Sequence, residues 1–108
     1  MKAKIVVPRA LAQQDVQEAL AYYQTQAGSA LALRFVDALE QAYAHLSLHG
    51  GSGSPRYAHE LNIPGLRAWA LTAFPYTVFY REEAAQIDVW RVLHQQRDLP
   101  AWMQTPEP

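Results

Sequence analysis

The sequence predicts an α+β fold in two layers, in which a hairpin of two helices covers one face of an antiparallel sheet. Hydrophobic residues recur with a period near 3.6 over residues 9–48 and with a period near 2 over residues 57–93. The segment HGGSGSP, residues 49–55, separates the two halves. A change of period across a flexible joint is typical of helices followed by a meander of strands. The predicted order is β-α-α-β-β-β(-β).

The first predicted elements are a short strand and two helices. Residues 2–7 are rich in β-branched residues, and the proline that follows suits the first turn of a helix. The first helix is predicted over residues 9–26 and the second over residues 30–48, each with one apolar stripe. Asp15 is assigned to a face away from this stripe. Because Gly28 suits a helix end, an antiparallel helix hairpin is expected.

Four short strands are predicted after the joint, in residues 57–61, 67–73, 76–81 and 86–93. The turns between them contain Pro64-Gly65, Phe74-Pro75 and residues 82–85. Sequentially adjacent strands joined by tight turns pair antiparallel.

The last predicted strand is apolar on both faces. Ile87, Val89 and Leu93 are assigned to one face, and Trp90 and Val92 to the other. A strand of this kind is central in its sheet or awaits a partner. Because one layer of helices covers only one sheet face, the opposite face is expected to be partly open.

Composition and charge limit the class of protein. Residues 1–108 are expected to form a single domain, with a C-terminal tail from about residue 99. The absence of cysteine excludes disulfides and thiolate metal sites. We expect a soluble, cytoplasmic protein, because there is no apolar run of about 20 residues for a bilayer and no secretory signal pattern.

The nine Lys/Arg and ten Asp/Glu residues give a formal net charge of −1. This balance argues against broad nucleic-acid binding, which needs a cation for each phosphate. It leaves room for a small arginine patch. No direct sequence-specific contact with nucleic acid and no membrane contact are expected.

Arg67 is the first candidate for recognition. It follows the Pro64-Gly65 turn and shares a strand face with Trp69, which predicts a guanidinium on the open sheet face that binds a phosphate or a carboxylate. The alternative is an arginine packed along an aromatic neighbour with its head in water.

His94 is the second candidate, because histidine can act as a general acid or base near neutral pH. It is assigned to the face of Trp90 and Val92, whereas Arg91 is assigned to the opposite face. The alternative is a structural or surface histidine. Arg97 with Asp98 is interpreted as a candidate contact or as a local ion pair of little energy.

His45 and His49 have a spacing that can hold a metal ion, but no third ligand stands near them. The alternative is that both favour the negative end of their helix. The glycine-rich joint lacks the Gly-Lys-Ser/Thr ending of a phosphate-binding loop, and Ser52 and Ser54 have no partner that would activate a nucleophile. Neither a metal nor a cofactor is expected.

An ordered set of motifs extends from Val7 to about Trp102. Its members are Pro8-Arg9-Ala10, Tyr22-Tyr23, Gly65-Leu66-Arg67, Phe74-Pro75-Tyr76, Tyr80-Arg81 and Val89-x-Arg91-Val92-Leu93-His94-x-x-Arg97-Asp98. This set resembles the RelE/ParE superfamily of toxins from bacterial toxin–antitoxin modules, and the ParE branch most of all.

The resemblance implies a toxin that a cognate antitoxin neutralises by wrapping a C-terminal segment around it. The ParE branch poisons DNA gyrase, whereas the RelE branch cleaves mRNA on the ribosome. RelE-like toxins are strongly basic, and the missing lysine cluster here favours the ParE branch. A protein that acts by binding, without catalytic residues of its own, is therefore expected.

Partner contacts are expected on the open sheet face and at the C-terminal end, with five candidate residues: Arg67, Trp69, Arg91, Arg97 and Trp102. The main alternative is an mRNA interferase that uses Arg67, which matches the family arginine, and His94, near a last-strand position that some ribonuclease members use. A third possibility is an antitoxin-binding domain without toxicity.

Overall fold

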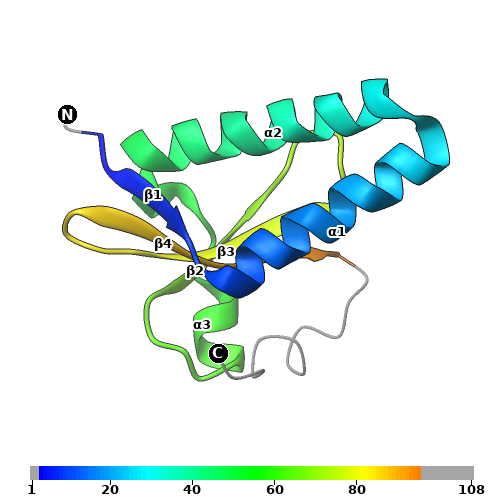
Figure 1. Ribbon diagram of the computed structural model, residues 1–108. Helices are drawn as coiled ribbons and strands as arrows, with labels where there is room; N and C mark the ends of the chain where they lie inside the picture. Colours follow the sequence, from blue (N-terminus) through cyan, green and yellow to red (C-terminus); the bar gives the residue numbers. More distant parts are fainter. Residues whose placement is uncertain (1–2, 96–108) are drawn as a thin grey trace.

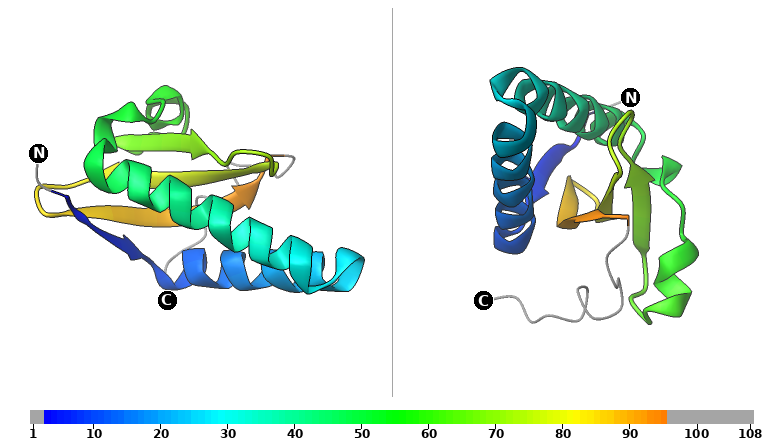
Figure 2. Two further views of the ribbon diagram at one scale, coloured as in Figure 1. Left: turned by 90° about the horizontal axis from the view of Figure 1, so that it is seen from above. Right: turned by 90° about the vertical axis from the view of Figure 1, so that its right-hand side faces the viewer.

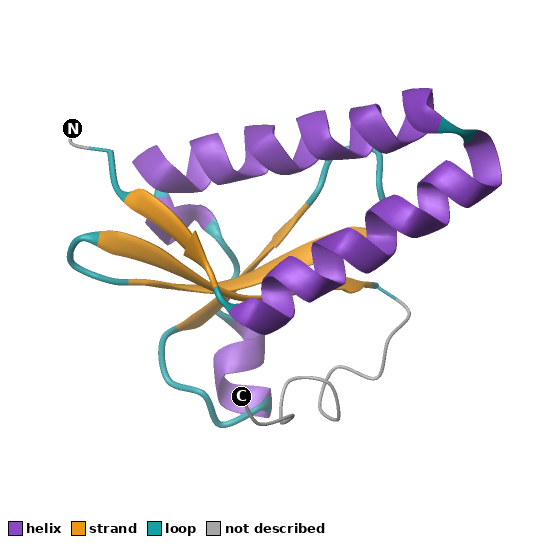
Figure 3. Cartoon of the chain, in the orientation of Figure 1, coloured by secondary structure: helices purple, strands orange, loops and turns teal. Residues whose placement is uncertain are grey.

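The computed structural model describes residues 3–95 and has the α+β architecture that the sequence predicts (Figure 1). Its elements are β1 (Ile5–Pro8), α1 (Ala10–Ala27), α2 (Ser29–Leu48), the 3-10 turn η1 (Gly50–Ser52), α3 (Arg56–Glu60), β2 (Leu66–Ala70), β3 (Tyr76–Glu82) and β4 (Gln86–His94). The two long helices lie over one face of the sheet, and α3 lies on the other side (Figures 1 and 3).

The helix hairpin is confirmed and turns at a single residue. Gly28 has a φ of +84°, a left-handed backbone that glycine adopts without steric cost, and its N–H closes α1 by donating to the carbonyl of Gln24 at 3.0 Å. The buried stripe of α2 consists of Ala32, Phe35, Leu39, Ala42 and Leu46. The buried stripe of α1 contains Asp15, which the sequence pattern had placed on another face.

The four strands form one mixed sheet in the order β1-β4-β3-β2. The predicted antiparallel meander is confirmed for β2, β3 and β4. The first strand pairs parallel with the last, so that Ile5 faces Gln86 and Pro8 faces Val89. The helix hairpin, seen from above in Figure 2, connects β1 at one edge of the sheet to β2 at the other edge. The meander then leads back to β1, where β4 pairs with it in parallel.

The sequence pattern predicted a strand over residues 57–61, and this prediction was wrong. Most of these residues belong to the short helix α3. The edge position beside β2 is already taken, because Ser54 pairs with Ala68 in an isolated bridge. The Ser54 hydroxyl also accepts a hydrogen bond from the Arg56 N–H at 3.2 Å, which supports a helical turn there. The apolar side chains of Tyr57 and Leu61 then pack on the sheet from outside.

A β-bulge changes the two faces of β4. Phe79 pairs with Arg91 while Tyr80 pairs with Val89, so Trp90 is the extra residue on β4. Val92 therefore lies in the core under the helices, as Ile87 and Val89 do, whereas Leu93 lies in the cluster on the opposite face. The assignment of Leu93 to the face of Ile87, and of Trp90 to the face of Val92, was wrong. It assumed strict alternation of faces along the strand, and the extra residue of the bulge interrupts that alternation.

The two sheet faces carry two separate apolar clusters. The larger lies between the helices and the sheet and contains an aromatic group in which Phe35 contacts Tyr23, Phe74 and Tyr76 at centroid distances of 5.5, 5.4 and 5.3 Å. The smaller, formed by Leu61, Leu66, Ala68, Phe79 and Leu93, lies against α3. Among residues 3–95, the face opposite the long helices is thus covered by α3 beside most of β2 and β3. We call the remainder, beside β1, β4 and the Arg81 end of β3, the open half.

Both outer strands have their edges partly closed. Just before β1, the Lys4 N–H donates to the Ser47 carbonyl at 2.9 Å and the Lys4 carbonyl accepts from the Ser47 hydroxyl at 2.6 Å. The carbonyl of Pro8 accepts from the side chain of Gln13 at 3.2 Å. On β2, Ala68 is paired with Ser54. Exposed strand edges invite unwanted pairing, and these contacts reduce the free length of both.

Over the described residues, neither α1 nor α2 combines the length and apolar content of a bilayer-spanning helix.

Candidate partner-binding site

Arg91 is buried, and Asp15 of α1 holds it. Its Nε and Nη2 donate to the two carboxylate oxygens of Asp15 at 2.8 Å each, and the same carboxylate accepts the Val92 N–H at 3.0 Å. Both side chains are under 10% exposed. The pair joins α1 to β4 just beyond the bulge. As a candidate partner contact Arg91 is poorly placed, because its guanidinium serves the fold.

Arg67 and Trp69 lie on the helix side of β2 and not on the open face, so that part of the expectation was wrong. Trp69 packs against the larger core and stacks on the ring of His45 at a centroid distance of 4.4 Å. The Nη1 of Arg67 donates to the carbonyls of Gly51 and Gly53 at 3.2 and 2.8 Å. Arg67 therefore fastens the glycine-rich joint to the sheet.

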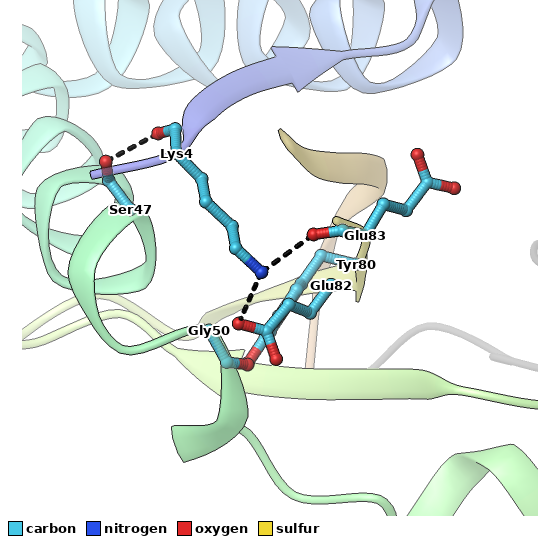
Figure 4. A network of polar contacts seen from close by, with 6 residues as sticks. All are labelled: Lys4, Ser47, Gly50, Tyr80, Glu82 and Glu83. Atoms are coloured by element: carbon cyan, nitrogen blue, oxygen red, sulfur yellow. Dashed lines mark hydrogen bonds and ion pairs between the residues drawn. The ribbon is translucent and has the colours of Figure 1, made fainter. Parts of the chain in front are cut away.

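The buried hydroxyl of Tyr80 also holds this joint, and its side chain reaches Gly50 (Figure 4). It donates to the Gly50 carbonyl at 2.6 Å and accepts the Gly53 N–H at 2.9 Å. Burial raises the pKa of Tyr80 above its usual value, although the Gly53 hydrogen bond opposes this shift. A β-carbon on Gly53 would overlap the Tyr80 ring and hydroxyl. The joint is thus a tightly placed strap and glycine is needed in it.

Lys4 closes the other side of this strap. Its ammonium donates to Glu82 Oε2 at 3.1 Å and to the Glu83 carbonyl at 2.7 Å, and the Glu82 side chain lies beside Gly50 (Figure 4). The shallow hollow here, of about 290 Å³, is lined mainly by residues 48–52 and by Glu82. The Glu82 carboxylate is already paired with Lys4, so the residues that line the hollow include no unpaired acid.

His94 lies far from Arg67. The ring of His94 packs edge-on against Tyr76 at a centroid distance of 5.2 Å, at one end of the sheet. Arg67 pairs with Tyr80 and His94 with Tyr76, so four residues of rise and two strand spacings put their Cα atoms about 16 Å apart. The two residues of the ribonuclease alternative are therefore not brought together.

The histidines at the end of α2 are explained without a metal. Their rings lie 5.1 Å apart, and His45 Nε2 lies 3.1 Å from the Ser52 hydroxyl while its ring stacks on Trp69. Within residues 3–95 no group of three or more His, Cys, Asp or Glu side chains could hold a metal ion.

A cluster that the sequence analysis missed lies on the open half. Arg9 donates through Nε and Nη2 to the two oxygens of Asp88 at 3.0 and 2.9 Å, and Trp90 Nε1 donates to the same carboxylate at 3.1 Å. The Arg9 guanidinium also lies 4.1 Å from the centre of the Trp90 ring. Asp88 stands between the apolar residues Ile87 and Val89 of β4, and an acidic residue at that place was the available signal.

The two remaining candidates, Arg97 and Trp102, lie outside the described residues.

The helix hairpin on a four-stranded mixed sheet is a known fold. A solved structure described as the chromosomal ParDE TA system from P. aeruginosa contains a similar chain, with a TM-score of 0.71 and 20% sequence identity over 85% of this chain and 96% of that one. The fold is thus one found in a toxin–antitoxin system. Comparison with curated proteins gave no match.

The family model described as "ParE toxin of type II toxin-antitoxin system, parDE" matches residues 6–99. Because this match includes most of the chain, the chain belongs to the ParE toxin family. The resemblance to the ParE branch that the motifs indicated is confirmed.

Proposed function

We propose that this ParE-family toxin arrests growth by binding DNA gyrase, without catalysis of its own, and that a cognate antitoxin neutralises it. The observation that carries the proposal is the family match over residues 6–99. The ParE branch is known for poisoning gyrase, and its systems pair each toxin with an antitoxin.

The geometry of the ribonuclease candidates supports a binding mechanism. Cleavage of mRNA needs an acid–base pair and cations around one phosphate. Here Arg67 donates to the backbone of the strap, Arg91 is paired with Asp15, and His94 lies about 16 Å from Arg67 by strand geometry. The net charge of −1 points in the same direction.

The open half supports an antitoxin contact. Ile5 and Val7 of β1 are 72% and 38% exposed, and they lie on the sheet face away from the long helices. Exposed apolar side chains beside a preorganised charged cluster are typical of a surface that a partner covers.

The deciding experiment follows DNA and protein synthesis by pulse-labelling within minutes of expressing the full chain without antitoxin. Gyrase poisoning predicts that thymidine incorporation falls before amino-acid incorporation, and that the purified chain traps cleaved DNA in a gyrase assay. The double variant Arg67→Ala, His94→Ala should behave in the same way, provided that circular dichroism shows it folded.

Two outcomes would contradict the proposal. An early fall in amino-acid incorporation, with mRNA cuts that vanish in the double variant, would identify an mRNA interferase. Unchanged growth at high expression would identify an antitoxin-binding domain without toxicity.

A further inference from the structure

The open half combines apolar side chains with an excess of positive charge. Val7, Asp88 and Arg81 lie side by side on neighbouring strands β1, β4 and β3. Arg81 points to this face, because Val78 and Tyr80, three residues and one residue before it, point to the core under the helices, whereas Phe79, two residues before it, points to the opposite cluster. Its Nε lies beside Gly65, at the start of β2.

The carboxylate nearest to Arg81 in the sheet is already occupied. Asp88 accepts from Arg9 with both oxygens and from Trp90 with one of them. In the part of the chain that the structure describes, no carboxylate lies within ion-pairing distance of Arg81. The row thus holds two arginines and one aspartate, and Arg81 supplies the uncompensated charge.

The edge contacts of β1 indicate how a partner approaches. Backbone groups of successive strand residues point to opposite sides, so Lys4, Val6 and Pro8 present theirs outward. Ser47 and Gln13 occupy those of Lys4 and Pro8, which leaves Val6 as the main residue for strand pairing. A partner therefore gains little from adding a strand and more from lying across the face.

We propose that Arg81 receives a carboxylate of the antitoxin, from a segment that also lays an apolar side chain over Ile5 and Val7. This inference rests on the proposed function and names the chemistry of the antitoxin contact. Two strand spacings separate Val7 from Arg81, about 10 Å, which is the distance between positions i and i+7 on one face of a helix. Charge complementarity selects an acidic segment over a neutral one.

The first test uses the full chain and the protein whose co-expression restores growth. Calorimetric titration should show a Kd that rises about tenfold in Arg81→Gln and about a hundredfold in Arg81→Glu, as expected for losing and reversing an interfacial charge. The matched control is Arg34→Glu, because Arg34 is exposed on α2 and undergoes the same change of charge. Its Kd should change less than about threefold. Replacing the contacting acidic residue of the antitoxin by lysine should restore binding to Arg81→Glu.

A second measurement does not need the antitoxin. The dye 8-anilinonaphthalene-1-sulfonate is an apolar anion of the proposed chemistry. Its fluorescence with the chain should weaken in Arg81→Gln and in Ile5→Ser but not in Arg34→Gln. If dye binding follows this pattern but no co-expressed protein restores growth, the open half is an apolar, positively charged binding surface. The antitoxin as its partner would then be rejected, together with the proposed function.

Other results would overturn the inference alone. Equal effects of Arg81→Glu and Arg34→Glu on antitoxin affinity would show a general charge effect. A lower melting temperature with unchanged Kd would mean that the carboxylate belongs to the same chain. Loss of self-association in Arg81→Glu, with unchanged antitoxin binding, would identify a second copy as the occupant.

Discussion

Replacing Asp15 by asparagine should destabilise the fold strongly, although it changes a single heavy atom. The carboxylate accepts two hydrogen bonds from the Arg91 guanidinium and one from the Val92 N–H, and both side chains of the pair are almost wholly buried. The variant keeps the shape, removes the negative charge and turns an amide N–H₂ toward a donor. It leaves the Arg91 charge buried without its counter-charge.

The expected cost is about 3–5 kcal/mol, the usual penalty for removing one partner of a buried ion pair. A domain of this size is stable by about 5–15 kcal/mol, so the variant loses a large part of its free energy of unfolding. Its melting temperature should fall by about 15 °C or more. Urea titration followed by tryptophan fluorescence gives the free energy of unfolding, and a thermal melt gives the melting temperature. Glu18→Gln, an exposed change on the same helix, should cost under about 0.5 kcal/mol.

A double variant separates charge from packing. Asp15→Leu combined with Arg91→Met removes both charges and should be less destabilised than either single variant, because no unpaired charge remains. A cost below about 1 kcal/mol for Asp15→Asn would refute the reasoning. Additive costs in the double variant would refute it as well.

Three further predictions follow from described contacts. Burial, and to a smaller extent the nearby Asp15 charge, raises the pKa of Tyr43 to about 12. This tyrosine should therefore stay protonated in an absorbance titration at 295 nm until about pH 12. Because its folded-state pKa lies above the unfolded value of 10, this tyrosine contributes stability below pH 10 that is lost as pH rises through 12; ionisation with the exposed tyrosines would contradict the burial. Gly53→Ala should cost about 1–3 kcal/mol because its β-carbon would overlap Tyr80, whereas Gly51→Ala, with its nearest neighbour 4.0 Å away, should cost little; equal urea midpoints would exclude the strap. Arg67→Gln should lower the melting temperature by a few degrees and leave growth arrest intact, and loss of arrest in a folded variant would assign it a direct role.

The helices were predictable because their information is local. The stripe of Ala32, Phe35, Leu39 and Leu46 repeats at helical spacing, and Gly28 stands where the chain reverses between the two helices. The meander was predictable for a similar reason, since its strands are short and joined by turn residues.

What failed depends on partners distant in the sequence. Residues 56–60 suit a strand or a helix, and the choice follows from Ser54 occupying the edge of β2. The bulge at Trp90 exists only in the register between β3 and β4, so no alternation within one strand reveals it. Because of the bulge, Leu93 and Trp90 lie on the sheet faces opposite to those predicted for them relative to Ile87 and Val92.

The candidate site was predicted less well than the fold. Asp15 and Arg91 are 76 residues apart, and only an acidic residue at the spacing of a buried stripe hinted at their pair. Arg67 was expected on the open face, but a strap of glycine carbonyls on the other side attracts its guanidinium. A strand pattern predicts that two residues share a sheet face, but it does not predict whether the long helices cover that face.

The partly closed sheet edges have a consequence for the toxin when no antitoxin covers it. A free strand edge would let copies of the chain stack into aggregates, which would remove the active molecule from solution. On β1, Ser47 and Gln13 occupy the outward groups on either side of Val6, and Ser54 occupies those of Ala68 on β2. These contacts belong to the chain itself, so they do not depend on a bound partner. The chain without a partner is thereby protected from edge-to-edge self-assembly.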